Sequence, residues 1–154
     1  MAVGSYPLGV AVNPDTNRVY VANRNDNTVS VIDGAGNTGV ATVAVGSYPD
    51  SVAVNPSTNR IYVANRNDNT VSVINGVANT VAAAVALWNL PVGVAVNPNT
   101  NRIYVTNELT DNVSVIDGGS NMVVATVRNR GRRELSPGRG REPRHKPRLR
   151  SEPE

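Results

Sequence analysis

Apolar and small polar residues alternate along most of this chain, which is the pattern of β-strands. In the first 45 residues, Val and Ile recur at every second position in short runs. A period of two is the spacing of a strand with one face fixed inward. The alternate positions hold Ala, Ser or Tyr rather than Lys or Glu, so the second face is also expected to pack against a neighbour. The pattern predicts four strands, at Gly9–Asn13, Arg18–Asn23, Thr28–Asp33 and Gly39–Val45.

Clusters of turn-forming residues separate these runs. Residues 13–17, 24–27 and 33–37 are rich in Asn, Asp, Gly and Pro. Pro presets the backbone for a turn, while Asn, Asp and Gly tolerate the left-handed conformation that hairpins need. We expect Gly34 and Gly76 to adopt that positive-φ conformation. The clusters predict tight antiparallel hairpins.

The strand-and-turn pattern occurs three times with a period of 42 residues. Residues 3–34 and 45–76 are identical at 27 of 32 positions. A period of about 40–50 residues in an all-strand unit is typical of β-propeller blades, each a four-stranded antiparallel sheet. The sequence therefore predicts an all-β fold with three such sheets in an open or partial propeller. We expect the blades at about residues 8–49, 50–91 and 92–127, within a repeat domain of residues 1–127.

One short motif recurs in every copy. Residues 20–23, 62–65 and 104–107 read Tyr-Val-Ala-Asn, Tyr-Val-Ala-Asn and Tyr-Val-Thr-Asn. Together with the flanking Val-Ala-Val-Asn-Pro and Val-Ser-Val-Ile segments, they resemble the YVTN β-propeller repeat family over residues 3–127. The resemblance implies an extracellular or cell-envelope propeller of the surface-layer type, whose members usually carry more blades. It also implies a non-enzymatic scaffold or binding module with protein or glycan partners at the cell surface.

Charge is distributed unevenly along the chain. Residues 1–127 hold five Arg and eight Asp or Glu, whereas residues 128–154 hold nine Arg, Lys146 and four Glu. The terminal segment has too few apolar residues to offset its conformational entropy, so we expect a disordered Arg/Pro-rich tail. It is either a genuine tail or the out-of-frame end of a longer repeat gene. A nucleic-acid contact is expected only through this tail, and the lack of aromatic residues for base stacking argues against it.

The sequence offers little catalytic chemistry. Cysteine is absent, and the one histidine, His145, lies in the tail. The Asn/Asp loops at 24–27, 66–69 and 108–112 hold one or two carboxylates each, fewer than a Ca²⁺ site needs. We therefore predict no enzyme, and no catalytic, cofactor-binding or metal-binding residues. The alternative is a fragment of an enzyme-type propeller, either a sugar-lactone hydrolase or a quinone- or haem-dependent oxidoreductase.

Four residues are candidates for a ligand or partner surface. Arg18, Arg60 and Arg102 recur at the start of the second strand of each copy. They either line an anion-binding surface or pair with a nearby Asp or with backbone carbonyls at the turn, and the pairing is preferred. Trp88 replaces a glycine of the repeat between the second and third copies. It either fills a gap between blades, which is preferred, or forms an exposed binding hot spot.

The remaining expectations concern the ends of the chain and its surroundings. The first residues lack the basic start and apolar stretch of a signal peptide, and no apolar run reaches the ~18 residues of a membrane span. Three blades cannot close a ring, so the two end blades should each leave an apolar face without a neighbour. Two chains could then combine as a homodimer that completes a six-bladed ring. Otherwise the exposed faces and strand edges should drive open-ended association or aggregation.

Overall fold

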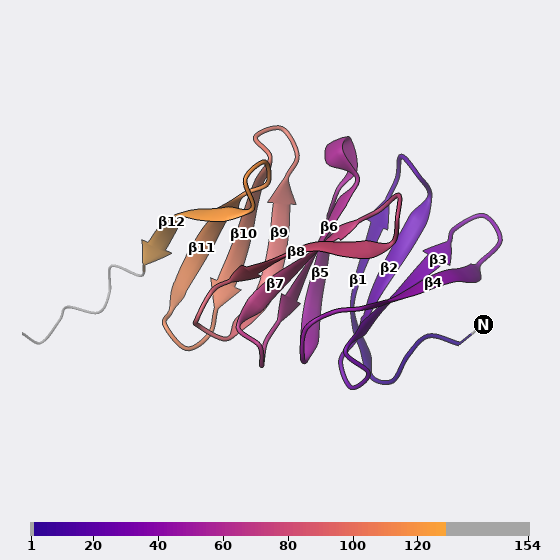
Figure 1. Cartoon of the computed structure of the whole chain (residues 1–154), viewed down its shortest axis with the longest axis horizontal. Helices are drawn as coiled ribbons and strands as arrows, with labels where there is room; N and C mark the ends of the chain where they lie inside the picture. The colour runs from indigo at the N-terminus through magenta and orange to yellow at the C-terminus, as the bar shows by residue number, and fades with distance from the viewer. Residues whose placement is uncertain (1, 129–154) are drawn as a thin grey trace, which may run out of the picture.

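A computed structural model describes residues 2–128 and shows an all-β protein (Figure 1). Three four-stranded antiparallel sheets stand side by side in chain order, and each sheet is one blade. The expected disordered tail lies outside the described residues, except for Arg128, which ends the last strand.

Each blade is a meander in which every strand pairs with the next one in the chain. Blade 1 consists of β1 (Pro7–Asn13), β2 (Arg18–Asn23), β3 (Thr28–Asp33) and β4 (Thr38–Ala44). Blade 2 consists of β5 (Pro49–Asn55), β6 (Arg60–Asn65), β7 (Thr70–Asn75) and β8 (Thr80–Ala86), with a short 3-10 turn, η1 (Pro56–Thr58), after β5. Blade 3 consists of β9 (Pro91–Asn97), β10 (Arg102–Asn107), β11 (Asn112–Asp117) and β12 (Met122–Arg128).

The fold predicted from the period of two and the repeat of 42 residues is confirmed. The second and third strands of the first copy have the predicted bounds, Arg18–Asn23 and Thr28–Asp33. The first strand of each blade begins at a proline, slightly before the expected position. A proline can begin a strand at the blade's edge because the missing N–H is not needed in the ladder there.

Asparagine, not glycine, takes the left-handed conformation at the end of each hairpin loop. The last loop residue before the second, third or fourth strand has a positive φ of 48–56° in every blade. Asn is one of the few non-glycine residues that tolerate this region, because its short side chain can hydrogen-bond locally. These residues are Asn17, Asn27, Asn37, Asn59, Asn69, Asn79, Asn101, Asp111 and Asn121.

The expectation for Gly34 and Gly76 was therefore wrong, since neither has a positive φ. Both glycines are required for a different reason, which is the close approach of a neighbouring side chain. A Cβ at Gly76 would lie 2.2 Å from Oδ1 of Asn59, and one at Gly34 would lie 2.5 Å from Oδ1 of Asn17. In both cases the glycine, in the turn between the third and fourth strands, leaves space for the asparagine that ends the loop between the first and second strands of its blade.

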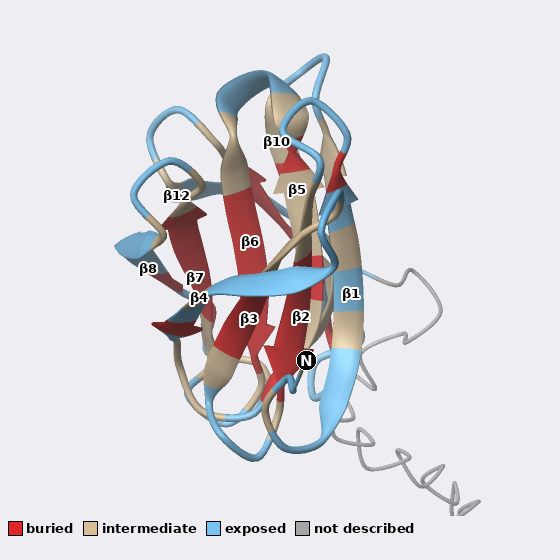
Figure 2. Ribbon diagram, turned by 90° about the vertical axis from the view of Figure 1, so that its right-hand side faces the viewer, coloured by how far each residue is buried: buried red, intermediate tan, exposed pale blue. Residues whose placement is uncertain are grey.

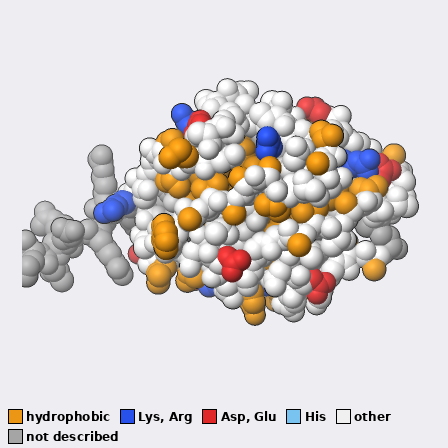
Figure 3. All heavy atoms as spheres, in the orientation of Figure 1, with side chains coloured by type: hydrophobic (Ala, Val, Ile, Leu, Met, Phe, Trp, Pro, Cys, Tyr) orange, Lys and Arg blue, Asp and Glu red, His pale blue; other side chains and the backbone are white. Residues whose placement is uncertain are grey.

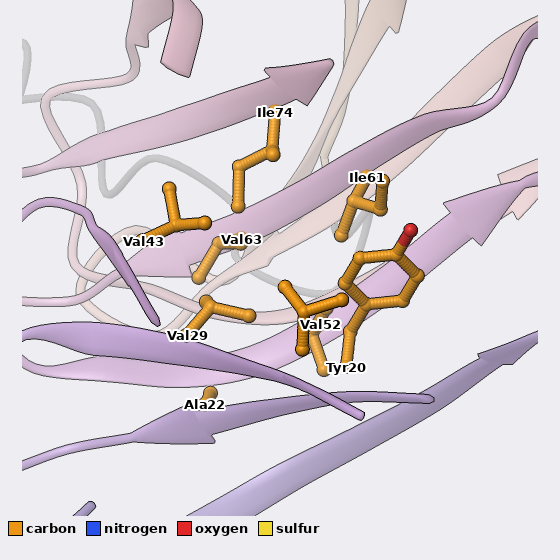
Figure 4. Packing of buried hydrophobic residues seen from close by; sticks show 9 residues of the cluster. Tyr20, Ala22, Val29, Val43, Val52, Ile61, Val63 and Ile74 are labelled. Atoms are coloured by element: carbon orange, nitrogen blue, oxygen red, sulfur yellow. The ribbon is translucent and has the colours of Figure 1, made fainter. Parts of the chain in front are cut away.

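The hydrophobic core lies between blades rather than within them. Tyr20 on β2 packs with Val52 and Ile61 of blade 2, and Figure 4 shows the three side chains turned toward one another. Tyr62 plays the same part between blades 2 and 3, where it joins Ile103 and neighbouring apolar residues. Each tyrosine is completely buried, and its hydroxyl has no hydrogen-bond partner among the described residues, so the apolar ring stabilises the junction and the hydroxyl offsets part of that gain.

Buried polar side chains also form hydrogen bonds between the strands of each blade. Asn65 at the end of β6 is buried, and its Nδ2 donates to the hydroxyls of Thr70 and Ser72 at 3.0 and 2.8 Å. Asn23 makes the same two bonds in blade 1. The asparagine of the Tyr-Val-Ala-Asn motif therefore ties the second strand of its blade to the third.

The outward faces of the end blades are much more exposed than the faces at the junctions. Figure 2 looks toward the blade 1 side, where β1 is exposed along most of its length. The corresponding strand of blade 2, β5, alternates buried and partly buried residues. At the other end, Tyr104 and Thr106 of β10 are exposed, whereas the corresponding residues of β6, Tyr62 and Ala64, are buried. Burial of a given repeat position therefore depends on whether a neighbouring blade covers it.

A methyl group at Gly76 should weaken the junction between blades 1 and 2. We expect Gly76→Ala to lower the free energy of unfolding by about 1–3 kcal/mol, because Asn59 must move away from the added Cβ. Gly119→Ala is the matched control, since its Cβ would meet only Asp117, at an ordinary contact distance of 3.4 Å. Urea unfolding of both variants measures the difference. Equal stability of the two variants would contradict this role for Gly76.

Candidate binding surface

A short segment, here called a connector, joins the last strand of one blade to the first strand of the next and lies at one end of the junction. The connector between blades 1 and 2 is Val45–Tyr48. Loop residue Asn27 of blade 1 holds it from one side, because the N–H of Tyr48 donates to the Asn27 side chain at 2.9 Å. Blade 2 holds it from the other side, where the N–H of Arg66 donates to the Tyr48 carbonyl at 2.9 Å. Arg24 lies over the Tyr48 ring at 5.1 Å and pairs with Asp50 at 3.0 Å. This connector is fixed on both sides.

The second connector, Leu87–Leu90, keeps only part of this arrangement. The N–H of Leu90 still donates to the Asn69 side chain at 2.8 Å, and the N–H of Glu108 to the Leu90 carbonyl at 3.1 Å. Ser47 in the first connector donates its N–H to Asp68 at 2.7 Å, but no matching bond is present at Asn89 among the described residues. The middle of the second connector is therefore held less tightly.

Trp88 lies in this less constrained connector and points into solvent. It is 81% exposed and has a φ of 71°, a conformation that favours glycine and that costs free energy for a bulky residue. The preferred expectation, that Trp88 fills a gap between blades 2 and 3, is wrong, because a gap-filling indole would be buried. The space under the connector is occupied by Leu87, which is 4% exposed.

The three repeated arginines do not behave alike. Arg18 pairs with Asp33 at 3.5 Å and Arg102 pairs with Asp117 at 2.5 Å, each across the strand register. In blade 2 the register places Asn75 opposite Arg60, so the acidic partner is missing. Within residues 2–128, Arg60 makes no salt bridge. Arg18 and Arg102 are thus neutralised locally, and Arg60 is the arginine of this set whose charge is left for an external anion.

Two buried tyrosine hydroxyls lie close to these arginines. Burial raises the pKa of the Tyr62 hydroxyl, an effect that Arg60 opposes and Asp117 of blade 3 strengthens. Burial likewise raises the pKa of Tyr20, against the influence of Arg18. A phenol with a raised pKa stays neutral at physiological pH, so neither hydroxyl supplies a nucleophile there.

The described residues offer no metal centre. Among residues 2–128, no three His, Cys, Asp or Glu side chains gather closely enough to hold a metal ion. No helix in the same part of the chain is long and apolar enough to cross a membrane.

Sequence reasoning missed one exposed residue beside the second connector and the ion pair next to it. Leu109, in the loop between β10 and β11, is 69% exposed. Its neighbour Glu108 pairs with Arg66 of blade 2 at 2.5 Å. The available signal was the substitution of Glu-Leu-Thr-Asp at 108–111 for the Arg-Asn-Asp-Asn of the other two copies. Trp88 and Leu109 are therefore the large apolar residues that depart from the repeat at the connector end of blades 2 and 3.

Acid should remove the stabilising effect of Asp117. The N–H and hydroxyl of Ser120 bond to this carboxylate and, together with Arg102, hold its pKa below the usual 3.8. A carboxyl whose folded-state pKa is lowered contributes stability above the unfolded pKa and loses it as the pH falls through the folded pKa. The melting temperature of Asp117→Asn should therefore be lower than that of the parent at neutral pH and equal to it at low pH.

Thermal melts across this pH range test the Asp117 prediction, with Asp15→Asn as the control. Asp15 is exposed in the turn between β1 and β2, and its carboxylate has no partner among the described residues. The Asp117→Asn chain should fold, because Asn75 accepts two backbone N–H bonds at the corresponding turn of blade 2. A difference in melting temperature that stays constant down to low pH would rule out the carboxylate as its cause.

Three solved structures illustrate the similarity of the fold. Kuenenia stuttgartiensis hydrazine synthase matches with a TM-score of 0.75 and 23% identity over 82% of this chain and 37% of its own. A functionally unknown protein from Desulfotomaculum acetoxidans gives a TM-score of 0.71 and 22% identity, with coverages of 82% and 43%. The dihydro-heme d1 dehydrogenase NirN, in complex with DHE, gives a TM-score of 0.67 and 16% identity, with coverages of 85% and 30%.

These likenesses concern the fold alone, and the chain spans less than half the length of each of these structures. No curated protein matches the sequence significantly. A family does match: the one described as lactonase, 7-bladed beta-propeller, aligns with residues 4–85, more than half of the chain. The match covers blade 1 and nearly all of blade 2, whose strands and junction are described above. The chain belongs to the lactonase-type seven-bladed β-propeller family.

Proposed function

We propose that this chain is a non-enzymatic binding or scaffold unit of the cell surface or envelope, which contacts a protein or glycan partner through the connector end of blades 2 and 3. The observation that carries the proposal is the exposure of Trp88, 81% of whose surface is open to solvent. Exposed tryptophans are costly and concentrate at sites where a partner covers them.

The position of Trp88 supports a binding role over a structural one. The first connector has Gly46 at the same place, and that glycine fits closely against Asn65. The second connector accepts a tryptophan in a left-handed conformation that glycine adopts without strain. Strained backbone of this kind is found preferentially at functional positions. Leu109 extends the exposed apolar surface on the adjacent loop, and Arg66 with Glu108 provides charges at its edge.

The surface location is proposed from the family resemblance seen in the Tyr-Val-Ala-Asn motif. Protein and glycan partners both suit an exposed indole, since its flat face covers apolar patches of proteins and its N–H can donate to a sugar hydroxyl. The unpaired charge of Arg60 would favour acidic partners on a second surface.

Trp88 is the single tryptophan of the chain, so its fluorescence reports directly on this site. We expect the free protein to emit like a solvent-exposed indole and the emission to shift to the blue when a partner covers it. Suitable probes are purified surface-layer protein and soluble glycan fragments of the cell envelope. The variant Trp88→Gly should lose at least about tenfold in affinity for the probe that binds, as expected for a hot-spot residue.

The glycine variant also separates binding from folding. Because the residue has a φ of 71°, Trp88→Gly should melt at or above the temperature of the parent. Val77→Ser is the matched control, since Val77 is 82% exposed but lies in the turn between β7 and β8. It should leave affinity unchanged. If Trp88→Gly binds each probe that the parent binds, and with the same affinity, the connector is not the binding surface.

The family match favours a second candidate, an enzyme-type propeller that hydrolyses a sugar lactone. Fold alone does not fix activity, so the family match leaves hydrolysis to a direct test. Hydrolysis of glucono-δ-lactone, followed in a pH-stat with and without Ca²⁺, Mg²⁺ or Zn²⁺, distinguishes the candidates. We expect the spontaneous rate. A rate above it that disappears on adding a chelator would favour the hydrolase.

A further inference from the structure

The two end faces of the protein carry residues that the internal junctions bury. Tyr104 on blade 3 corresponds to Tyr20 and Tyr62, but it is 40% exposed where they are completely buried. Val10 on blade 1 corresponds to Val52 and is 64% exposed, against 7% for Val52. The same repeat positions are thus exposed only where no neighbouring blade covers them. Each end face is one half of a blade junction.

We propose that a second copy of this chain docks head to tail, with blade 3 of one copy against blade 1 of the other. The junctions between blades 1 and 2 and between blades 2 and 3 supply the geometry. The new junction would repeat their contacts with residues that are already in place, so it continues an established interface. Such a contact is heterologous, because the two surfaces that meet are different.

A pair of asparagines marks every internal junction. Nδ2 of Asn13 donates to Oδ1 of Asn59 at 2.8 Å, and Asn55 donates to Asn101 in the same way at 2.8 Å. The next donor in this series is Asn97, whose own Oδ1 is already occupied by the N–H of Asn99, as that of Asn13 is by Asp15. The corresponding acceptor is Asn17, which is exposed on blade 1. In the proposed contact, Asn97 donates to Asn17 of the second copy.

Charge complementarity supports the same pairing. Arg66 and Glu108 occupy equivalent loop positions on neighbouring blades and form an ion pair. Arg24 occupies that position on blade 1. When blade 3 meets blade 1 of a second copy, Glu108 meets Arg24, and the charges are opposite as they are at the second junction. The first junction has two arginines at these positions, and Arg24 pairs there with Asp50 instead. Two blade 3 faces would bring two Glu108 side chains together, and two blade 1 faces two Arg24 side chains. The charges therefore favour head-to-tail over symmetric docking.

Blade 3 also presents a recess for the connector of a following blade. The recess has a volume of about 420 Å³ and lies between the loop before β11 and the end of β12. In blade 2, the equivalent wall residues Val71 and Val85 cluster with Leu87, the connector residue that enters there. The recess is lined by Thr106, Asn107, Asp111, Asn112, Val113, Val127 and Arg128.

The start of the chain reproduces the connector that fits such a recess. Residues 3–7 read Val-Gly-Ser-Tyr-Pro, as residues 45–49 do, and Tyr6 has the same φ of 55° as Tyr48. They are held on blade 1 by one side only, through bonds such as Arg24 N–H to the Tyr6 carbonyl at 3.0 Å. Val3 is 38% exposed and Tyr6 is 54% exposed. In the proposed contact, Val3 of the second copy enters the recess and the Tyr6 N–H donates to Asp111.

Complementation between two blocked variants tests the proposal. Figure 3 shows apolar side chains exposed across one face of the protein, so the test must distinguish specific docking from nonspecific hydrophobic association. Val10→Asp blocks the blade 1 face and Tyr104→Asp blocks the blade 3 face. We expect the parent chain to associate as its concentration rises in sedimentation velocity, and each variant alone to stay monomeric. An equimolar mixture should form a 1:1 dimer, because one intact face remains on each partner.

Val77→Asp serves as the control, since Val77 is more exposed than Val10 but lies on a turn away from both faces. It should associate like the parent. Circular dichroism confirms that the variants keep their β structure, which is expected because both substituted side chains already face solvent. The proposal is overturned if the parent stays monomeric up to high micromolar concentration, if either blocked variant still associates, or if the mixture contains only monomers.

Discussion

Each blade of this protein has two apolar faces and can cover neither of them without a neighbour. A four-stranded sheet that is polar on one side can leave that side in water, but here Val, Ile and Tyr are placed on both sides. Blade 2 has a neighbour on each side, and its strand β6 holds the longest run of buried residues among the described strands. The stability of any one blade is therefore a property of its junctions, as in other repeat proteins where neighbours share a core.

The hairpin loops connect local conformation to these junctions. Asn59 ends the first hairpin of blade 2 in a left-handed conformation and also accepts the hydrogen bond from Asn13 of blade 1. Gly76, in the turn between β7 and β8, is the residue that leaves room for the Asn59 side chain. A single asparagine thus satisfies a local requirement of the turn and a long-range requirement of the propeller, which explains why this loop chemistry recurs in each copy.

The strands and their order could be predicted from the sequence because a period of two and a period of 42 residues leave little choice of fold. The turns could not be assigned in detail. Asn and Gly lie close together in the turn clusters, and only the backbone conformation in the structure shows that Asn takes the positive φ. The difference between Arg60 and the other two arginines was visible in principle, as Asn75 replaces the Asp of blades 1 and 3, but its meaning depends on knowing that these residues are paired. The exposure of Trp88 could not be foreseen, because it follows from the path of the connector, where Trp88 has a positive φ and Gly46 at the same place does not.

The two internal junctions are nearly interchangeable in their apolar contacts and differ in their charges. Arg24 meets Asp50 in the first, and Arg66 meets Glu108 in the second. During folding, blades this similar can pack beside the wrong neighbour, and a hydrophobic surface alone would accept the error. A misplaced copy of blade 1 after blade 2 would place Leu8 where Asp50 stands in the first junction and Arg24 where Glu108 stands in the second, so Arg66 would meet no carboxylate and Glu108 would lose its partner. The order in which the blades assemble is therefore specified by a few charged residues at the edges of the junctions, and not by the core.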